Sequence, residues 1–244
     1  FLSEAKVSRA EARDRYDDLF EFAHVGYLTL SEQGKILVIN FAAAEQLGIE
    51  RPSEEEPRER YLYYPHTAPV PEGVAVNVRG RSYKILANVD VTDVNASGVI
   101  FAHGSRFGGH ALFIKNKKLY YVYNFLGIKP EQQFISGVEI TPGKHTFGME
   151  FVRDSTGKNG EQIGFMKLFI NDQVVASGAM RTQPGKFTLS GDGLCVGYDS
   201  GDAVSSEYKT PGEFEGGKII GVGVTVEKAQ YLDLEKEAKT KFRD

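Results

Sequence analysis

Two histidines and an arginine lie close together at His103, Arg106 and His110, in the glycine-rich stretch 102–110. A glycine-rich loop allows close approach to the backbone, so these side chains could line a strand–loop–strand rim that contacts a ligand or a partner. The same residues would also suit a hairpin whose polar side chains form hydrogen bonds within the fold. The histidines are not at the spacing of a zinc motif, and no third ligand lies nearby in the sequence.

Two carboxylates, Asp199 and Asp202, flank a serine and a glycine. Carboxylate oxygens and loop carbonyls are ligands that calcium prefers, so this loop could hold a structural calcium ion. The alternative is a solvated loop in which the aspartates form Asx turns. We predict no other cofactor.

Four aromatic residues follow one another closely, at Tyr120, Tyr121, Tyr123 and Phe125. Such rings could form a platform for carbohydrate, although in an alternating strand half of them would face the core. We therefore add Tyr121 and Tyr123 to the candidate rim or interface contacts.

The single cysteine, Cys195, excludes a disulfide within the chain, a cysteine-based zinc finger and an iron–sulfur site. The residues around Cys195 are typical of a strand. We therefore expect Cys195 to be a small, packed side chain and not a nucleophile.

The elements that must position these residues are mostly short strands. Apolar side chains alternate with polar ones over 82–91, 146–152 and 165–170, a period of two that is typical of half-buried antiparallel strands. Further strands are predicted over 99–102, 111–114, 119–125, 134–140, 187–189, 194–198 and 219–226. Turn residues separate them, for example at 115–117 and 171–172. So many strands in about 160 residues predict a mainly β fold, an antiparallel β-sandwich of the jelly-roll kind.

The first 60 residues differ in composition, with 13 acidic residues, 8 basic residues and 3 of the 27 glycines. A helix is predicted after Ser8, then a hairpin over 25–39. Asn40 should cap a short helix over 41–47. Prolines around an acidic run at 51–57 predict a boundary, and a last helix is expected over 233–242.

The charge and hydropathy of the chain exclude some partners. With 29 basic and 33 acidic residues the net charge is −4, which argues against nucleic acid. No apolar run approaches the roughly 20 residues that span a bilayer, and the first residues lack the layout of a signal peptide. We therefore expect no membrane partner and a cytoplasmic location.

Residues of about 13–51, and within them the stretch from Arg15-Tyr-Asp-Asp-Leu-Phe to Leu47-Gly-Ile49, resemble the opening of a PAS sensory domain. The resemblance implies an α+β fragment that could sense a ligand, dimerise or signal to an effector. The three further strands that complete a PAS sheet are missing after Pro57. A homodimer through this fragment is therefore one expectation.

Residues 58–236 resemble the C-terminal domain of bacterial arylsulfatases. The stretches that carry the resemblance are 61–72, 76–83, 99–113, 119–127, 142–145 and 196–205, of which Val99–Phe113 is the most specific. The resemblance implies a concanavalin/laminin-G-like sandwich that packs beside a catalytic domain. The Cys/Ser-x-Pro-x-Arg motif of sulfatases is absent, so we do not expect this chain to be an enzyme.

These observations predict a PAS-like segment over 1–56, a sandwich over 57–232 and a helix over 233–244. The predicted function is a non-catalytic accessory module that binds another polypeptide, such as a sulfatase catalytic domain. The alternatives are a lectin-like carbohydrate-binding module and a PAS-mediated signalling or dimerisation protein. The change at Pro57 would also fit two half-domains joined by gene rearrangement or by an error in assembling the gene.

Overall fold

The computed structural model describes residues 25–32, 36–47, 59–184, 189 and 193–227. The chain divides into two compact units, Phe1–Pro57 with Gln230–Asp244, and Arg58–Ala229. Within the described residues, no helix has the length and apolarity needed to cross a membrane. The predicted helices after Ser8 and over 233–242 lie outside the described residues.

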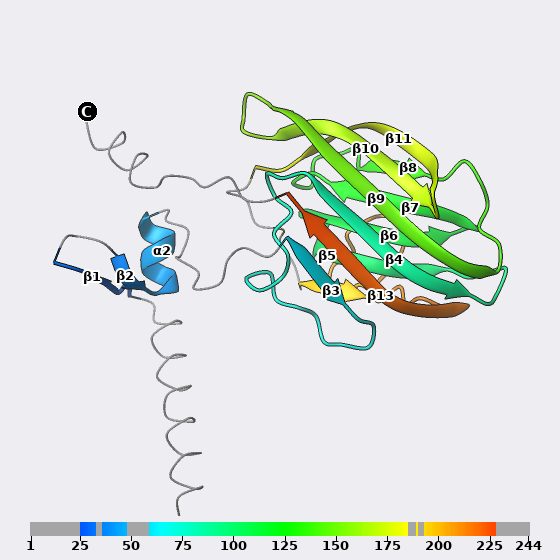
Figure 1. The fold of residues 1–244 in the computed structure, drawn as a ribbon, viewed down its shortest axis with the longest axis horizontal. Helices are drawn as coiled ribbons and strands as arrows, with labels where there is room; N and C mark the ends of the chain where they lie inside the picture. The colour runs from blue at the N-terminus through cyan, green and yellow to red at the C-terminus, as the bar shows by residue number, and fades with distance from the viewer. Residues whose placement is uncertain (1–24, 33–35, 48–58, 185–188, 190–192, 228–244) are drawn as a thin grey trace, which may run out of the picture. The chain divides into compact units, whose positions relative to one another are not determined.

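The larger unit contains a six-stranded antiparallel sheet (Figure 1). Its strand order is β11-β10-β9-β4-β13-β3. The strands are β3 (Arg60–Tyr63), β4 (Tyr83–Val91), β9 (Gly143–Thr156), β10 (Gln162–Ile170), β11 (Gln173–Thr182) and β13 (Gly217–Val226).

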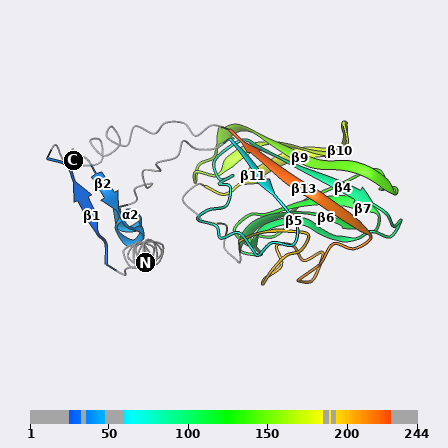
Figure 2. The same ribbon diagram turned by 60° about the horizontal axis from the view of Figure 1, so that its bottom comes forward.

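A five-stranded antiparallel sheet faces it, as the edge-on view of Figure 2 shows. Its order is β12-β5-β6-β7-β8. The strands are β5 (Gly98–Ser105), β6 (Gly108–Lys115), β7 (Lys118–Asn124), β8 (Gln132–Ile135) and β12 (Leu194–Val196). The predicted antiparallel β-sandwich is confirmed.

The main core lies between the two sheets. In β4, alternate side chains from Tyr83 to Val91 are buried, as the period of two predicts. The largest buried side chains of the core include Ile85, Phe101, Leu112, Phe147, Met149, Phe151 and Met166. The hydroxyl groups of Tyr83 and Tyr121 lie 2.8 Å apart, so a hydrogen bond joins the sheets through the core.

The five-stranded sheet is buried on its outer face as well. The loop between β12 and β13 covers that face (Figure 2), and its Val204 and Tyr208 pack on a second cluster. The strand members of this cluster are Val99, Ala102, Ala111, Phe113, Tyr120 and Val122. The ammonium of Lys115 holds the loop through the Glu207 carboxylate at 2.8 Å. Because both faces of this sheet are buried, the apolar residues of β5, β6 and β7 follow one another along the chain and do not alternate with polar residues.

Apart from shifts of a few residues at strand ends, the main differences from the prediction concern three edge strands. β3 and β11 are the two edges of the six-stranded sheet and were not predicted. β8 ends at Ile135 instead of continuing to Ile140, because the Ser136 hydroxyl donates to the Val138 carbonyl in a turn. These edge strands are partly exposed on both faces, so their apolar periodicity is weak. Of the predicted strand 187–189, only Leu189 is described, and it is not in a strand.

The smaller unit contains the predicted hairpin and short helix. β1 (Leu28–Leu30) pairs with β2 (Ile36–Ile39), and α2 (Phe41–Leu47) follows. The Asn40 side-chain oxygen accepts from the Ala43 amide at 3.0 Å, which is the predicted N-cap. It also accepts from the Tyr27 amide at 2.8 Å and so joins helix and hairpin.

Candidate functional site

The predicted rim histidines are core residues. His103 and His110 lie directly opposite each other on β5 and β6, with 1% and 0% of their surface exposed. Their side chains point between the sheets, where the ring centroids are 5.7 Å apart. Of the predicted histidine–arginine rim only Arg106 lies at the surface, because the hairpin turns at Arg106 and its strands are buried on both faces. The rim interpretation is wrong for both histidines.

Burial keeps both imidazoles neutral. It lowers the pKa of His103 to about 4, with a smaller contribution from the charge of Arg79. It lowers the pKa of His110 well below the usual range, to which His103 contributes. His110 Nδ1 lies 3.2 Å from the Tyr121 hydroxyl, whereas neither ring nitrogen of His103 has a hydrogen-bond partner within the described residues.

The predicted tyrosine platform also lies in the interior. Tyr121 and Tyr123 are fully buried between the sheets, and the Tyr123 hydroxyl accepts from the Gln183 amide at 3.0 Å. Tyr120 points to the opposite face of the sheet but is covered by the β12–β13 loop. Since both faces of β7 are covered, these rings cannot form a carbohydrate platform, which corrects the rim assignment of Tyr121 and Tyr123.

The two candidate calcium ligands have different partners. Asp199 is buried, and its Oδ2 accepts from the Val204 amide at 3.0 Å and from the Tyr208 hydroxyl at 2.5 Å. Asp202 is exposed and forms an ion pair with Arg106 at 3.3 Å. No group of three or more His, Cys, Asp or Glu side chains in the described part of the chain could hold a metal ion. Asp199 therefore serves as an internal acceptor that shapes the β12–β13 loop.

Cys195 is a buried, unpaired cysteine in β12. Its sulfur lies 3.3 Å from the Ser200 hydroxyl, and only 2% of the residue is exposed. This placement agrees with the predicted small packed residue.

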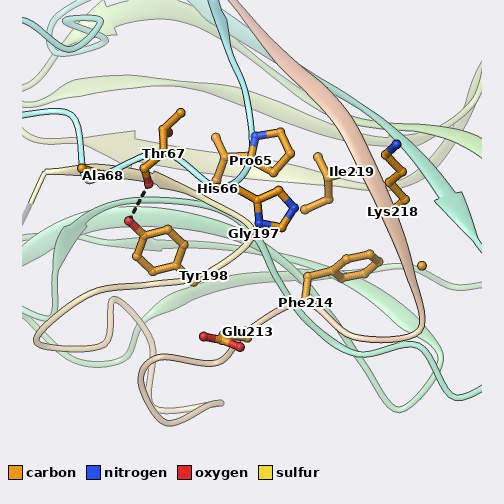
Figure 3. A pocket seen from close by; sticks show the side chains of 12 residues that line it. Pro65, His66, Thr67, Ala68, Gly197, Tyr198, Glu213, Phe214, Lys218 and Ile219 are labelled. Atoms are coloured by element: carbon orange, nitrogen blue, oxygen red, sulfur yellow. Dashed lines mark hydrogen bonds between the residues drawn. The ribbon is translucent and has the colours of Figure 1, made fainter.

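A pocket of about 490 Å³ opens where the edges of the two sheets meet. We call it the side pocket (Figure 3). Its walls come from three segments: 65–68 after β3, 196–198 at the end of β12, and 213–219 leading into β13. β3 and β12 are edge strands of their sheets, and an isolated bridge joins Val70, in the segment after β3, to Leu194 of β12.

The side pocket combines ring faces with a few polar groups. His66, Tyr198 and Phe214 provide rings, while Glu213 and Lys218 provide exposed charges of opposite sign. The Tyr198 hydroxyl donates to the Thr67 carbonyl at 2.9 Å and so holds the 65–68 segment in place (Figure 3). Burial and the neighbouring Cys195 raise the pKa of Tyr198, which favours its role as a donor.

His66 has a backbone φ of 63°, a conformation that residues other than glycine seldom adopt. Such residues concentrate at functional sites, where the surrounding structure maintains the strain. Sequence reasoning missed this pocket because its three walls are up to about 150 residues apart in the chain and share no motif.

No protein-family model matches the sequence, and no curated protein matches it. Among solved structures, the chain is similar to the CBM40 domain of a Ruminococcus gnavus IT-sialidase bound to α2,3-sialyllactose. The TM-score is 0.44 and the identity 14%, over 74% of this chain and 97% of that one. It is also similar to domains LG4-5 of the mouse laminin α1 chain, with a TM-score of 0.40 and 13% identity over 72% of this chain. This chain spans 40% of that laminin structure. At such identities the likeness concerns the fold alone.

Proposed function

We propose that the sandwich is a non-catalytic, lectin-like module that binds carbohydrate in the side pocket. The observation that carries the proposal is the combination of three rings, a carboxylate and an ammonium around one open pocket. Its volume of about 490 Å³ lies within the range of small-ligand sites.

Carbohydrate chemistry fits this lining. A pyranose ring has C–H groups on its faces, which pack well on aromatic rings such as Tyr198 and Phe214. Its hydroxyl groups both donate and accept hydrogen bonds. Ligand hydroxyl groups could donate to the Glu213 carboxylate at one end of the pocket and accept from the Lys218 ammonium at the other.

A glycan array followed by NMR titration of the best glycan tests the proposal. Phe214→Ala and Glu213→Gln should each weaken binding about tenfold, because each removes a direct contact worth about 1–2 kcal/mol. Phe165→Ala and Glu139→Gln are matched controls at positions outside the side pocket and should bind as the unmodified chain does. An array without any bound glycan, or full binding by both pocket variants, would reject the proposal.

The non-catalytic part of the proposal has its own test. The one cysteine is buried and contacts Ser200 in the β12 region. We expect no turnover of an aryl sulfate ester, with or without calcium. Turnover that persists through further purification would contradict this part of the proposal.

A second candidate function follows from the outer face of the six-stranded sheet. Four apolar side chains lie in one row of paired positions across it, interleaved with two glycines: Leu62, Gly223, Leu86, Gly148, Phe169 and Val174. Leu62 and Val174 are 60% and 52% exposed. Exposed apolar patches favour protein contacts, so this row supports an accessory module that binds another polypeptide. The resemblance of residues 58–236 to a sulfatase C-terminal domain makes a sulfatase catalytic domain the partner to test first.

Mixing the chain with a separately purified sulfatase catalytic domain tests this candidate. Sedimentation should show a complex that Leu62→Lys with Leu86→Lys abolishes, while Val94→Lys, at an exposed loop position, leaves it intact. Independent sedimentation of the two proteins would reject it.

A further inference from the structure

A second pocket, of about 620 Å³, lies among three loops of the five-stranded sheet. We call it the loop pocket. It is bounded by the β5–β6 turn at 106–107, the β7–β8 loop at 124–131 and the β12–β13 loop at 201–210. None of these residues lines the side pocket.

Five charged side chains line the loop pocket: Arg106, Lys129, Glu131, Asp202 and Lys209. The two carboxylates already have partners. Glu131 accepts from the Ser205 hydroxyl at 2.8 Å and from the Ser206 amide at 2.9 Å, one on each oxygen. Asp202 pairs with Arg106.

The positively charged side chains of the loop pocket have fewer interaction partners than the two carboxylates. Lys129 and Lys209 are exposed, and within the described residues neither ammonium has an ion-pair or hydrogen-bond partner. The side chains of Arg106 and Asp202 are 61% and 53% exposed, so their ion pair contributes little to stability. The other N–H donors of the Arg106 guanidinium stay available to a ligand. The lining therefore presents a net positive field to a ligand.

We propose that the loop pocket binds a small organic anion through Arg106, Lys129 and Lys209. The volume exceeds what a bare oxyanion would fill and lies in the range of organic ligands. The Phe107 ring, 57% exposed beside the Arg106 guanidinium, offers an apolar face for the body of the ligand. The chemistry that the pocket recognises is a carboxylate or a phosphate, and the proposal does not depend on sugar binding in the side pocket.

Three probes with the same sugar ring distinguish a carboxylate ligand from a phosphate ligand. Glucuronate carries a carboxylate, glucose 6-phosphate carries a phosphate, and glucose is uncharged. Titration calorimetry of the full chain carrying Phe214→Ala, which weakens the side pocket, should show binding of at least one anionic probe and no binding of glucose. Affinity should fall as salt is raised from 20 to 300 mM, since added ions screen exposed charges.

Lys129→Ala with Lys209→Ala should weaken the anionic probe at least about tenfold, because two charge-assisted contacts are removed. Lys144→Ala with Lys158→Ala removes the same charge from exposed positions on β9 and the following turn, and should leave binding unchanged. Thermal melting verifies that each variant is folded.

Three outcomes would overturn the proposal: equal affinity for glucose, unchanged binding by the Lys129/Lys209 variant, or no binding of either anionic probe at 10 mM. The side-pocket variant Phe214→Ala should bind the anionic probe normally. Failure of the carbohydrate proposal and failure of this one are therefore distinguishable.

Discussion

His103 and His110 bring two imidazoles into the core of the sandwich. A buried polar group without a partner costs about 1–3 kcal/mol, and a buried charge costs more. The neutral form is the only one that this interior tolerates, because the neighbouring charged group is the cation of Arg79. The hydroxyl groups around His110 belong to Tyr83, Tyr121 and Tyr123, which also stay neutral when buried.

The buried histidines should make the protein sensitive to acid. A histidine has a pKa near 6.5 when unfolded, whereas His103 has a folded pKa of about 4. The unfolded state therefore binds the proton first, and stability that is fully present above pH 6.5 falls as the pH drops toward 4. The expected loss from His103 is about 2 kcal/mol at pH 5 and approaches about 3 kcal/mol below pH 4. Urea unfolding at pH 7.5, 6 and 5 measures it.

His103→Phe should weaken this pH dependence without abolishing it, since the buried His110 remains. NMR titration of the two imidazoles provides an independent measurement if that variant folds poorly. His66→Asn, at an exposed position, should keep the dependence of the unmodified chain. An His103 imidazole that titrates near pH 6.5 in the folded protein would disprove the explanation.

Asp199 is the residue that shapes the β12–β13 loop. Tyr208→Phe removes one of its donors and should lower the free energy of unfolding by about 1–3 kcal/mol, because the acceptor is charged and buried. Tyr64→Phe, at an exposed tyrosine, is the control and should change it by less than about 0.5 kcal/mol. Chemical denaturation measures both.

The calcium prediction can be examined on the same protein. Because Asp199 Oδ2 already accepts two hydrogen bonds and Asp202 pairs with Arg106, the melting temperature should be equal in calcium and in EDTA. A melting temperature that rises with calcium would restore an ion site at Asp199 and Asp202.

At the scale of elements, close contact between neighbouring strands limits the size of the side chain that fits at some positions of β10. A Cβ atom on Gly164 would overlap the Val152 carbonyl and approach the Phe151 ring. Gly164→Ala should therefore destabilise the protein by about 1–3 kcal/mol in urea unfolding. At Gly137 the nearest atom to a new Cβ is the Val175 carbonyl oxygen at 3.6 Å, an ordinary contact, so Gly137→Ala should be nearly neutral. Equal stability of the two variants would contradict this explanation.

At the scale of the whole molecule, the two units should differ in local stability. A two-stranded hairpin is marginal alone, and Tyr27, Leu28 and Leu30 in or beside β1 are 52%, 40% and 53% exposed. Central strands such as β4 and β9 have buried partners on both sides. Native-state hydrogen exchange should show β4 and β9 amides exchanging only by global unfolding and β1 amides exchanging much faster. Equal protection would indicate that the smaller unit is stabilised as part of a larger fold.

The sequence predicted the inner strands well and the edges poorly. β4 and β10 alternate because one face meets the core and the other meets solvent. β11 was missed because its small and polar residues, such as Ser177 and Gly178, carry little periodicity. The Asn40 cap and the 115–117 turn were predictable because each depends on local backbone geometry, and Asn116 and Lys117 indeed have positive φ.

The sequence alone determined that this is an antiparallel sandwich without a sulfatase motif, since alternation and motifs are local properties of the chain. Only the tertiary structure decided which polar residues are accessible. One loop covers the outer face of β5–β7 and buries Tyr120 there, while the opposite sheet encloses His103 and Tyr121. The side pocket and the loop pocket each join segments that are far apart in the chain, and such proximity depends on how the sheets pack and not on any local pattern.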